Sequence, residues 1–348
     1  MTETPPEPLI AHPLFFELQA LEPILLHAHN GSALRGMLYR AVVELATGET
    51  LPAGQLEFRP DDPVLQMLLA TLSEDNPRGR DIPRPYVIEP PASDARSSGT
   101  ASDHLIQPGE SFTFGITLFG PAIEAFAIIV MALKLAENRG IGRFLGATGG
   151  RGRFKLVRAL ATNPLTRITQ EILAPGERRV MLPRVSIIPA DIAAQAALDA
   201  SGRPGRLRIH FHTPATLKSK GELIREPVFS VVIHRLIERL GELTAHHGRP
   251  PLACLPADRE ARNALLGLAD QVALVDNQTR WTELRGFSDR TRAPTNLSGI
   301  TGAADYAAAE PAVANFAPFL EILRWGEVTH AGQNAVKGNG VIRIQMVE

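Results

Sequence analysis

One order of predicted elements occurs twice along this chain, and the duplication limits the fold more than any other feature does. Apolar and polar side chains alternate along strand-like segments, and apolar residues recur at helical spacing after the N-cap candidate Ser32 until Gly48. The first half is predicted to contain a strand at 14–21, a helix after Ser32, strands at 86–89 and 112–119, a helix at 121–138 and a strand at 154–160.

The second half repeats this order of strand, helix, two strands, helix and strand. The predicted elements are a strand at 207–213, a helix at 227–247, middle strands at 272–282 and in the segment up to Tyr306, a helix at 312–325 and a strand at 341–345. This order is typical of the ferredoxin-like arrangement. We therefore predict an α+β fold of two tandem ferredoxin-like (RRM-like, βαββαβ) domains. A chain of 348 residues with 44% apolar side chains suffices for two cores.

The domain limits follow from the positions of proline and glycine. Residues 161–205 contain repeated Pro and Gly punctuation and one short strand candidate at 179–188. We expect an N-terminal domain at 1–160, a connection at 161–205 and a C-terminal domain at 206–348.

A glycine-rich loop precedes the last predicted strand in both halves. The first lies at 139–152, and the second is the stretch HAGQNAVKGNG at 330–340. Glycines allow backbone N–H groups to turn towards an anion, and Lys337 adds charge, although tight turns alone also use glycine. The nucleotide-binding pattern GxxxxGK[ST] is absent, because Lys337 precedes Gly338.

The charge distribution favours a polyanionic partner. The formal net charge is −1, yet residues 139–170 and 200–221 contain basic residues and no acidic ones. Solvated charged faces are the alternative explanation.

The single cysteine, Cys254, excludes an internal disulfide and a cysteine-rich metal site. The N-terminal residues lack signal-peptide features and no apolar run has the length of a membrane span, so we expect a cytoplasmic protein with no membrane partner, cofactor or metal.

Several short motifs, taken in order, carry a resemblance to a known family. They are NGSALRGML at 30–38, RPYVIEPP at 84–91, FTFGITLFG at 112–120, FHTPATLK at 211–218, REPVF at 225–229 and LSGITG at 297–302, followed by the loop at 330–340. With them the chain resembles the CRISPR-associated endoribonucleases of the RAMP superfamily, which cut precursor crRNA within its repeats.

The resemblance implies a metal-independent reaction and a set of partners. In that reaction the ribose 2′-hydroxyl attacks the adjacent phosphate, which leaves a 2′,3′-cyclic phosphate and a 5′-hydroxyl. The implied partners are the precursor crRNA repeat, the mature crRNA and, where the product is retained, subunits of a CRISPR effector complex.

The resemblance does not assign the general base. Many relatives carry a histidine in the helix after the LRG motif, where this chain has Tyr39 and Arg40. Histidine suits proton transfer near neutral pH. The catalytic candidates are His29, His27, Tyr39 and His330. The candidates for RNA binding are Arg139, Arg143, Arg151, Arg153, Lys218, Lys220, Arg290, Arg292, Lys337, Gly338 and Gly340.

Two other functions fit the same residues. The missing helix histidine is compatible with a noncatalytic RAMP subunit that only holds crRNA. Outside RNA biology, a ferredoxin-like protein that binds a small anionic metabolite also fits. Binding that weakens steeply as salt rises would favour RNA over the small ligand.

Overall fold

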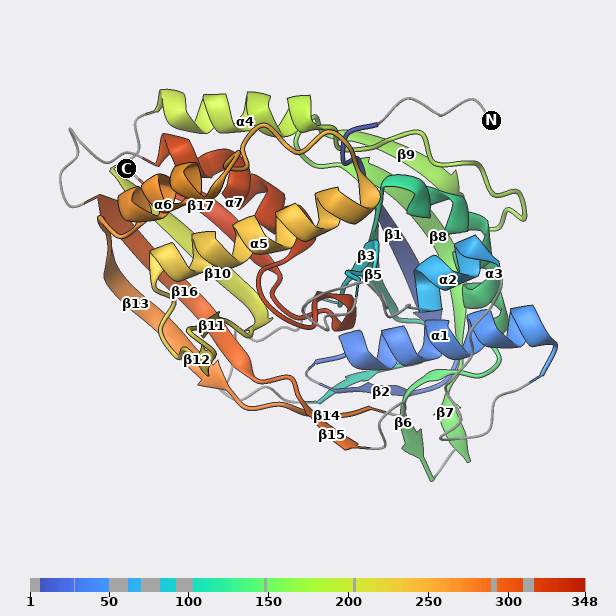
Figure 1. Ribbon diagram of the computed structural model, residues 1–348. Coiled ribbons are helices and arrows are strands. Elements are labelled where there is room, and N and C mark those ends of the chain that lie inside the picture. Colours follow the sequence, from blue (N-terminus) through green and yellow to red (C-terminus); the bar gives the residue numbers. More distant parts are fainter. Residues whose placement is uncertain are drawn as a thin grey trace.

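The structure is a computed structural model that describes residues 7–27, 29–49, 62–69, 82–91, 103–146, 149–202, 205–288, 293–308 and 316–347. Each half of the chain forms an antiparallel sheet with helices on it (Figure 1). The first sheet has the order β3-β5-β1-β8-β9. Its strands are β1 (Ala11–Ala20), β3 (Tyr86–Glu89), β5 (Ser111–Phe119), β8 (Phe154–Asn163) and β9 (Ile168–Leu173).

The helices of the first half pack on this sheet. They are α1 (Gly31–Thr47), α2 (Pro63–Leu69), the 3₁₀ segment η1 (Gly120–Ala125) and α3 (Phe126–Ala136). Leu34 and Val42 of α1 and Ile129 of α3 are buried in one cluster with Phe16 and Ile116 of the sheet. Apolar side chains at helical spacing therefore meet those that alternate along the strands.

The second half repeats the arrangement with the sheet order β13-β16-β10-β17. Its strands are β10 (Arg206–Ala215), β13 (Val272–Thr282), β16 (Gly299–Ala308) and β17 (Ile342–Val347), and its helices are α5 (Phe229–His247), α6 (Arg259–Ala269) and α7 (Ala317–Thr329). In the first sheet the four strands shared by both halves are β1, β3, β5 and β8, and in the second sheet they are β10, β13, β16 and β17. When these strands are numbered one to four along the chain, their order across each sheet is 2-3-1-4. This is the ferredoxin-like order, so the predicted tandem ferredoxin-like fold is confirmed.

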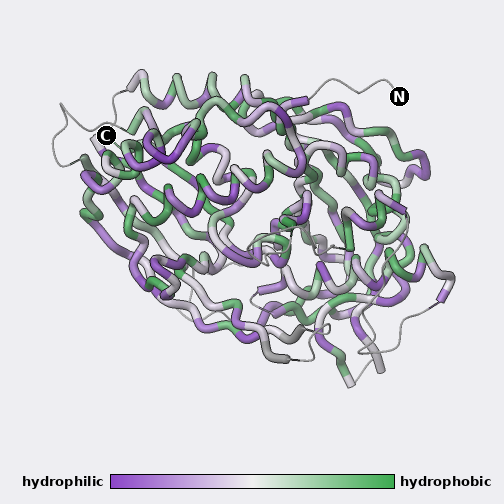
Figure 2. Tube along the Cα trace, in the orientation of Figure 1, coloured by the Kyte–Doolittle hydropathy of each residue, from purple (hydrophilic) through white to green (hydrophobic). Residues whose placement is uncertain are grey.

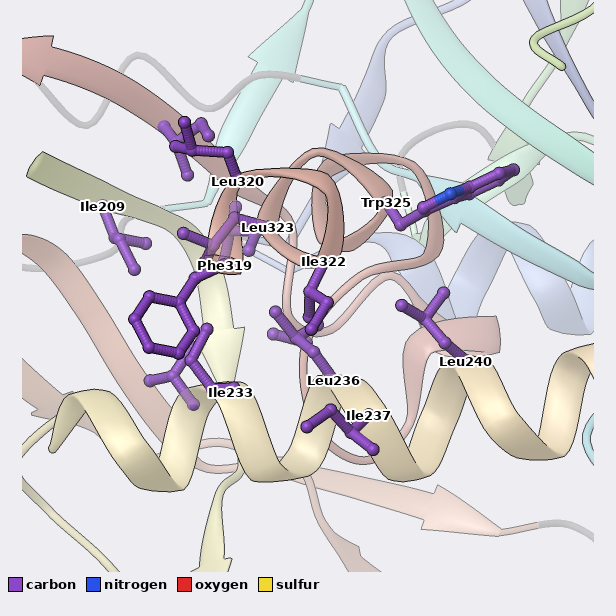
Figure 3. Close-up of a cluster of buried hydrophobic side chains, with 14 of the residues drawn as sticks. Ile209, Ile233, Leu236, Ile237, Leu240, Phe319, Leu320, Ile322, Leu323 and Trp325 are labelled. Atoms are coloured by element: carbon purple, nitrogen blue, oxygen red, sulfur yellow. The ribbon is translucent and has the colours of Figure 1, made fainter. Parts of the chain in front are cut away.

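Helices α5 and α7 cross closely in the core of the second half. Leu236 and Leu240 of α5 and Ile322 of α7 are buried, as Figure 3 shows. A Cβ added at Gly326 of α7 would lie 2.9 Å from the terminal methyl carbons of Leu236, so a larger residue there would have to displace that side chain. This packing fixes the C-terminal end of α7, from which the loop at 330–340 leaves.

The segment 161–205 contains more regular structure than the sequence indicated. Strand β9 extends the first sheet, while α4 (Pro189–Ser201) packs on α7, with Asp199 2.7 Å from Arg324. The strand predicted at 179–188 is wrong except for one bridge between Ile187 and Ala11. Met181 N also donates to Ile172 O of β9 at 2.9 Å, but this pairing does not extend into a ladder. The limits 1–160, 161–205 and 206–348 stay a prediction.

The two halves share buried contacts. Leu9, Ala11, Val87 and Phe119 from the first half belong to the hydrophobic cluster of the second half. Arg249 N also donates to Glu7 O at 2.6 Å. The halves are thus held against each other by apolar packing and by backbone hydrogen bonds.

Small two-stranded sheets and one 3₁₀ turn complete the described structure. They are β2 (Ile24–Leu26) with β4 (His104–Ile106), β6 (Ile141–Leu145) with β7 (Gly150–Gly152), β11 (Lys218–Ser219) with β12 (Glu222–Leu223), β14 (Arg285–Ser288) with β15 (Ala293–Asn296), and η2 (Ala335–Lys337). Hydrophilic and hydrophobic segments interleave along both halves (Figure 2). None of the helices among the described residues combines the length and apolarity that a membrane crossing requires.

Candidate active site

The N-terminus of α1 lies directly against residues 330–340, which we call the final loop. A Cβ added at Gly31, the first residue of α1, would lie 1.9 Å from the Lys337 carbonyl oxygen. One added at Gly338 would lie 3.2 Å from the Gly31 Cα. We call this contact, made by residues 29–31 with residues 337–339, the α1–loop junction. It joins the first half of the chain to the second.

The helix starts two residues earlier than its sequence predicts. The expected N-cap was Ser32, but the N-cap residue is Asn30 and helical geometry begins at Gly31. Only glycine fits the close approach at this position, so packing against the final loop determines where the helix begins.

The final loop is shaped by residues with positive φ. Gly332, Asn334, Gly338 and Gly340 have φ values of 86°, 62°, 83° and 74°. The Gly340 N–H donates to Pro214 O at 3.0 Å, and the Gly338 N–H donates to Ala335 O at 3.0 Å. These two glycines therefore direct their N–H groups into the chain and not towards an anion, which corrects the interpretation drawn from the sequence.

Asn339 is the central polar residue of the junction. Its side chain is fully buried, and its Nδ2 donates to Pro214 O at 3.0 Å and to Leu297 O at 2.9 Å. The amide orientation is thereby fixed, with Oδ1 as the remaining acceptor. His29 Nε2 lies 3.0 Å from this Oδ1, so Nε2 carries a hydrogen and donates it.

His29 is held in a state suited to proton transfer. Burial lowers its pKa, while hydrogen bonds with the Asn339 side chain and the Lys337 backbone oppose the shift. Because the net shift is downward, the ring is neutral near pH 7. With the hydrogen on Nε2, Nδ1 is the atom that can accept a proton.

His27 belongs to a hydrogen-bond network separate from that of His29. Its Nδ1 lies 3.2 Å from Asp103 Oδ1, and its Nε2 accepts from Arg143 Nε at 3.1 Å. Arg143 Nη1 also lies 2.9 Å from Asp103 Oδ2. Since the guanidinium can only donate, the proton of neutral His27 resides on Nδ1 and points at the carboxylate.

The remaining catalytic candidates lie elsewhere. The His330 side chain is 1% exposed, and burial together with the charges of Arg239 and Arg343 lowers its pKa well below the ordinary value. Tyr39 is half-buried beside a small apolar cavity that Leu38 and Val42 also line. The His330 side chain nevertheless reaches the α1–loop junction from the interior, through a hydrogen bond with the Asn339 backbone, whereas Tyr39 lines the apolar cavity.

Four of the six arginines predicted to bind RNA are engaged by other groups of the protein. Arg139 lies 2.5 Å from Glu44, Arg153 lies 2.7 Å from Glu22, and Arg151 donates to the Gly142 carbonyl. Arg139 and Arg153 remain about half exposed, but a carboxylate partner compensates much of the charge of each.

The other predicted RNA-binding residues have mixed positions. Lys218 and Lys220 lie at the β11–β12 turn, and Lys337 is half-buried in the final loop. Gly338 and Gly340 are buried. Arg290 and Arg292 lie outside the described residues.

Among the residues that the structure describes, no group of three or more His, Cys, Asp or Glu side chains is placed to hold a metal ion.

Two polar residues of these networks escaped the sequence analysis. Asn339 stands between two glycines in the final loop, and this position was the only feature of the sequence that pointed to it. Asp103 stands at the end of a long polar segment. Each acts through a histidine that was recognised, and only the fold shows the pairing.

Comparison with known proteins agrees with this architecture. A family model described as an N-terminal domain matches residues 9–185, and the model of the CRISPR-associated endoribonuclease Cas6 matches residues 209–342. No curated protein matches the chain.

Solved structures share the whole fold at low sequence identity. Thermus thermophilus Cas6 is 14% identical, with a TM-score of 0.53 over 97% of this chain and 99% of its own. A Cas6 product complex gives the same identity and TM-score over 96% and 100%. A partial Cas6-RT-Cas1–Cas2 complex is 12% identical, with a TM-score of 0.58 over 99% of this chain and 47% of the other.

The sheet order defines the class of fold, two ferredoxin-like domains in tandem. One family model matches the first half of the chain and the other matches the second half. Residues 209–342 match the family of the CRISPR-associated endoribonuclease Cas6, and solved Cas6 structures share the fold of the whole chain.

Proposed function

We propose that this protein cuts precursor crRNA within its repeats, without a metal ion, at the α1–loop junction. The observation that carries the proposal is the hydrogen bond between His29 and Asn339. It places a histidine of lowered pKa where the two halves meet, beside a loop whose conformation is fixed by the chain itself.

In the proposed reaction the ribose 2′-oxygen attacks the neighbouring phosphorus, and the bond from phosphorus to the 5′-oxygen breaks. His29 Nδ1 takes the 2′-hydroxyl proton, while Nε2 stays bound to Asn339 and keeps the ring oriented. The leaving 5′-oxygen takes up a proton, which gives 2′,3′-cyclic phosphate and 5′-hydroxyl ends. No electrons are gained or lost.

The other candidates receive subordinate roles in this proposal. His27 is the second choice for proton transfer, because Arg143 occupies its Nε2 until a phosphate draws the guanidinium away. His330 and Tyr39 support the loop and α1 by packing. The candidate lysines Lys218, Lys220 and Lys337 and the partly exposed candidate arginines contact the RNA backbone. Retention of the cut RNA within a CRISPR complex is part of the same proposal.

The test is cleavage of the cognate repeat RNA in excess EDTA. We expect a cut by the wild type and a loss of about 10²-fold to 10⁴-fold in single-turnover rate for His29→Ala, with RNA affinity retained. His246→Ala removes an exposed histidine at the end of α5 and serves as the control. An unchanged rate for His29→Ala would remove His29 from the mechanism.

A noncatalytic RNA-binding subunit is the second candidate. It is favoured by the absence of histidine from α1, where Tyr39 and Arg40 stand. Tight binding of repeat RNA with no cleavage, both in EDTA and with added divalent metal, would establish this function instead.

A further inference from the structure

A charged cavity lies between α5 and the outer side of the final loop. Its volume is 490 Å³. Thr216, Gly332 and Gln333 line it from the loop side, and Pro83 lines it from the first half of the chain. Its five ionisable residues are Lys218, Arg235, Arg239, Glu238 and Glu242. The cavity is distinct from the α1–loop junction, whose residues do not line it.

Arg239 is a buried cation without an anionic partner. Its Nε donates to Thr329 O at 2.5 Å, at the C-terminal end of α7, but its Nη2 is buried and has no hydrogen-bond partner. Among the described residues it makes no ion pair. Burial lowers its pKa only to about 10, so the guanidinium is charged at neutral pH. A buried charge of this kind is costly unless an anion compensates it.

One of the two carboxylates of the cavity is engaged by cations. Glu238 pairs with Arg235 and lies 3.4 Å from Arg262, whereas Glu242 is partly exposed and has only the His246 ring beside it, at 3.8 Å. Arg235 is engaged as well, because it also donates to Lys218 O at 2.6 Å. Lys218 has no ion pair within the described chain. Arg239 and Lys218 thus bring two positive charges without an ion pair to the cavity, against the one carboxylate of Glu242, so a net positive charge remains.

We infer that this cavity is a phosphate-binding site, with Arg239 at its base and Lys218 at its rim. A guanidinium presents parallel N–H donors to phosphate oxygens, and an ammonium supplies a point charge. The ligand is a phosphate group, either in the RNA backbone or free in solution. The first source rests on the proposed function, and the second does not.

Inorganic phosphate is the first probe, used on the full chain without RNA. We expect phosphate to raise the melting temperature more than chloride does at equal ionic strength. Lys218→Ala should weaken the apparent phosphate affinity about 10-fold or more, and Lys155→Ala, an exposed lysine on β8, should leave it unchanged. Arg239→Gln should abolish the effect; if it does not fold, Lys218→Ala still decides. Equal stabilisation of wild type and Lys218→Ala would overturn the inference, as would no phosphate-specific stabilisation of the wild type.

Repeat RNA then distinguishes the two sources. If the cavity holds a backbone phosphate, Lys218→Ala weakens RNA binding and lowers its salt dependence by about one phosphate contact relative to Lys155→Ala. If both variants bind RNA alike while phosphate still stabilises the wild type, the ligand is free phosphate. Because the melting experiment contains no RNA, it remains decisive even if the protein cuts none.

Discussion

Replacement of Gly31 by alanine tests whether the α1–loop junction is as tight as the structure shows. The added Cβ would lie 1.9 Å from Lys337 O, 2.5 Å from Lys337 C and 2.9 Å from Gly338 Cα. All three are backbone atoms, so no side-chain rotation can relieve the overlap. Either α1 or the final loop must move.

The effect of Gly31→Ala on the free energy of unfolding can be compared with that of the same substitution at Gly36, another glycine of α1. Alanine in a helix is favoured over glycine by about 0.5 to 1 kcal/mol. Gly36 has no atom within 4 Å of an added Cβ, so Gly36→Ala should raise the free energy of unfolding by that amount. Overpacking at Gly31 should instead lower it by about 1 to 3 kcal/mol.

Urea denaturation and single-turnover cleavage measure the two consequences. We expect the two variants to differ by about 1.5 to 4 kcal/mol in unfolding free energy. We also expect Gly31→Ala to cut RNA slowly, because a displaced loop moves Asn339 away from His29. If Gly31→Ala matches Gly36→Ala in both assays, the close contact of α1 with the final loop is refuted.

Three further predictions concern protonation and the contact between the halves. The acid limb of the pH–rate profile should lie below pH 6.5, because the pKa of the proposed base His29 is lowered; a limb above 6.5 would contradict this. Burial lowers the pKa of His12 to about 4, so the unfolded chain binds a proton between pH 6.5 and 4 that the folded chain does not. The contribution of His12 to the free energy of unfolding should therefore be fully present above pH 6.5 and decrease by about 3 kcal/mol towards pH 4. Urea denaturation of His12→Gln should show a correspondingly flatter pH dependence. Glu89→Gln removes the 2.6 Å ion pair with Arg343 between the halves, and because both side chains are partly exposed, calorimetry should show a loss of no more than about 1 kcal/mol.

The fold was largely predictable because each main element buries one periodic face. Alternation at 112–119 and helical spacing at 227–247 correspond to β5 and α5. The failures lie where local signals compete with distant contacts. Ser32 has a good N-cap side chain, but the final loop determines the helix start. The segment 179–188 has strand composition, but its backbone meets neighbouring strands only at isolated points, Ile187 at Ala11 and Met181 at Ile172.

The site was predictable only in part, because its pairs join distant residues. His29 could be named from its chemistry, but its partner Asn339 lies 310 positions away. The basic block at 139–153 contains no acidic residue, yet Glu22, Glu44 and Asp103 fold back onto it. Runs of like charge in a sequence therefore overstated the free positive charge of the surface.

Repeat RNA with a single 2′-deoxyribose at the scissile nucleotide tests the central claim most directly. With all-ribose RNA in excess EDTA, the account predicts one cut and a 2′,3′-cyclic phosphate end. With the deoxy substitution it predicts binding of similar affinity and no cut, because the nucleophile is gone. Cleavage of the deoxy RNA at the normal rate, or cleavage only when a divalent metal is added, would contradict it.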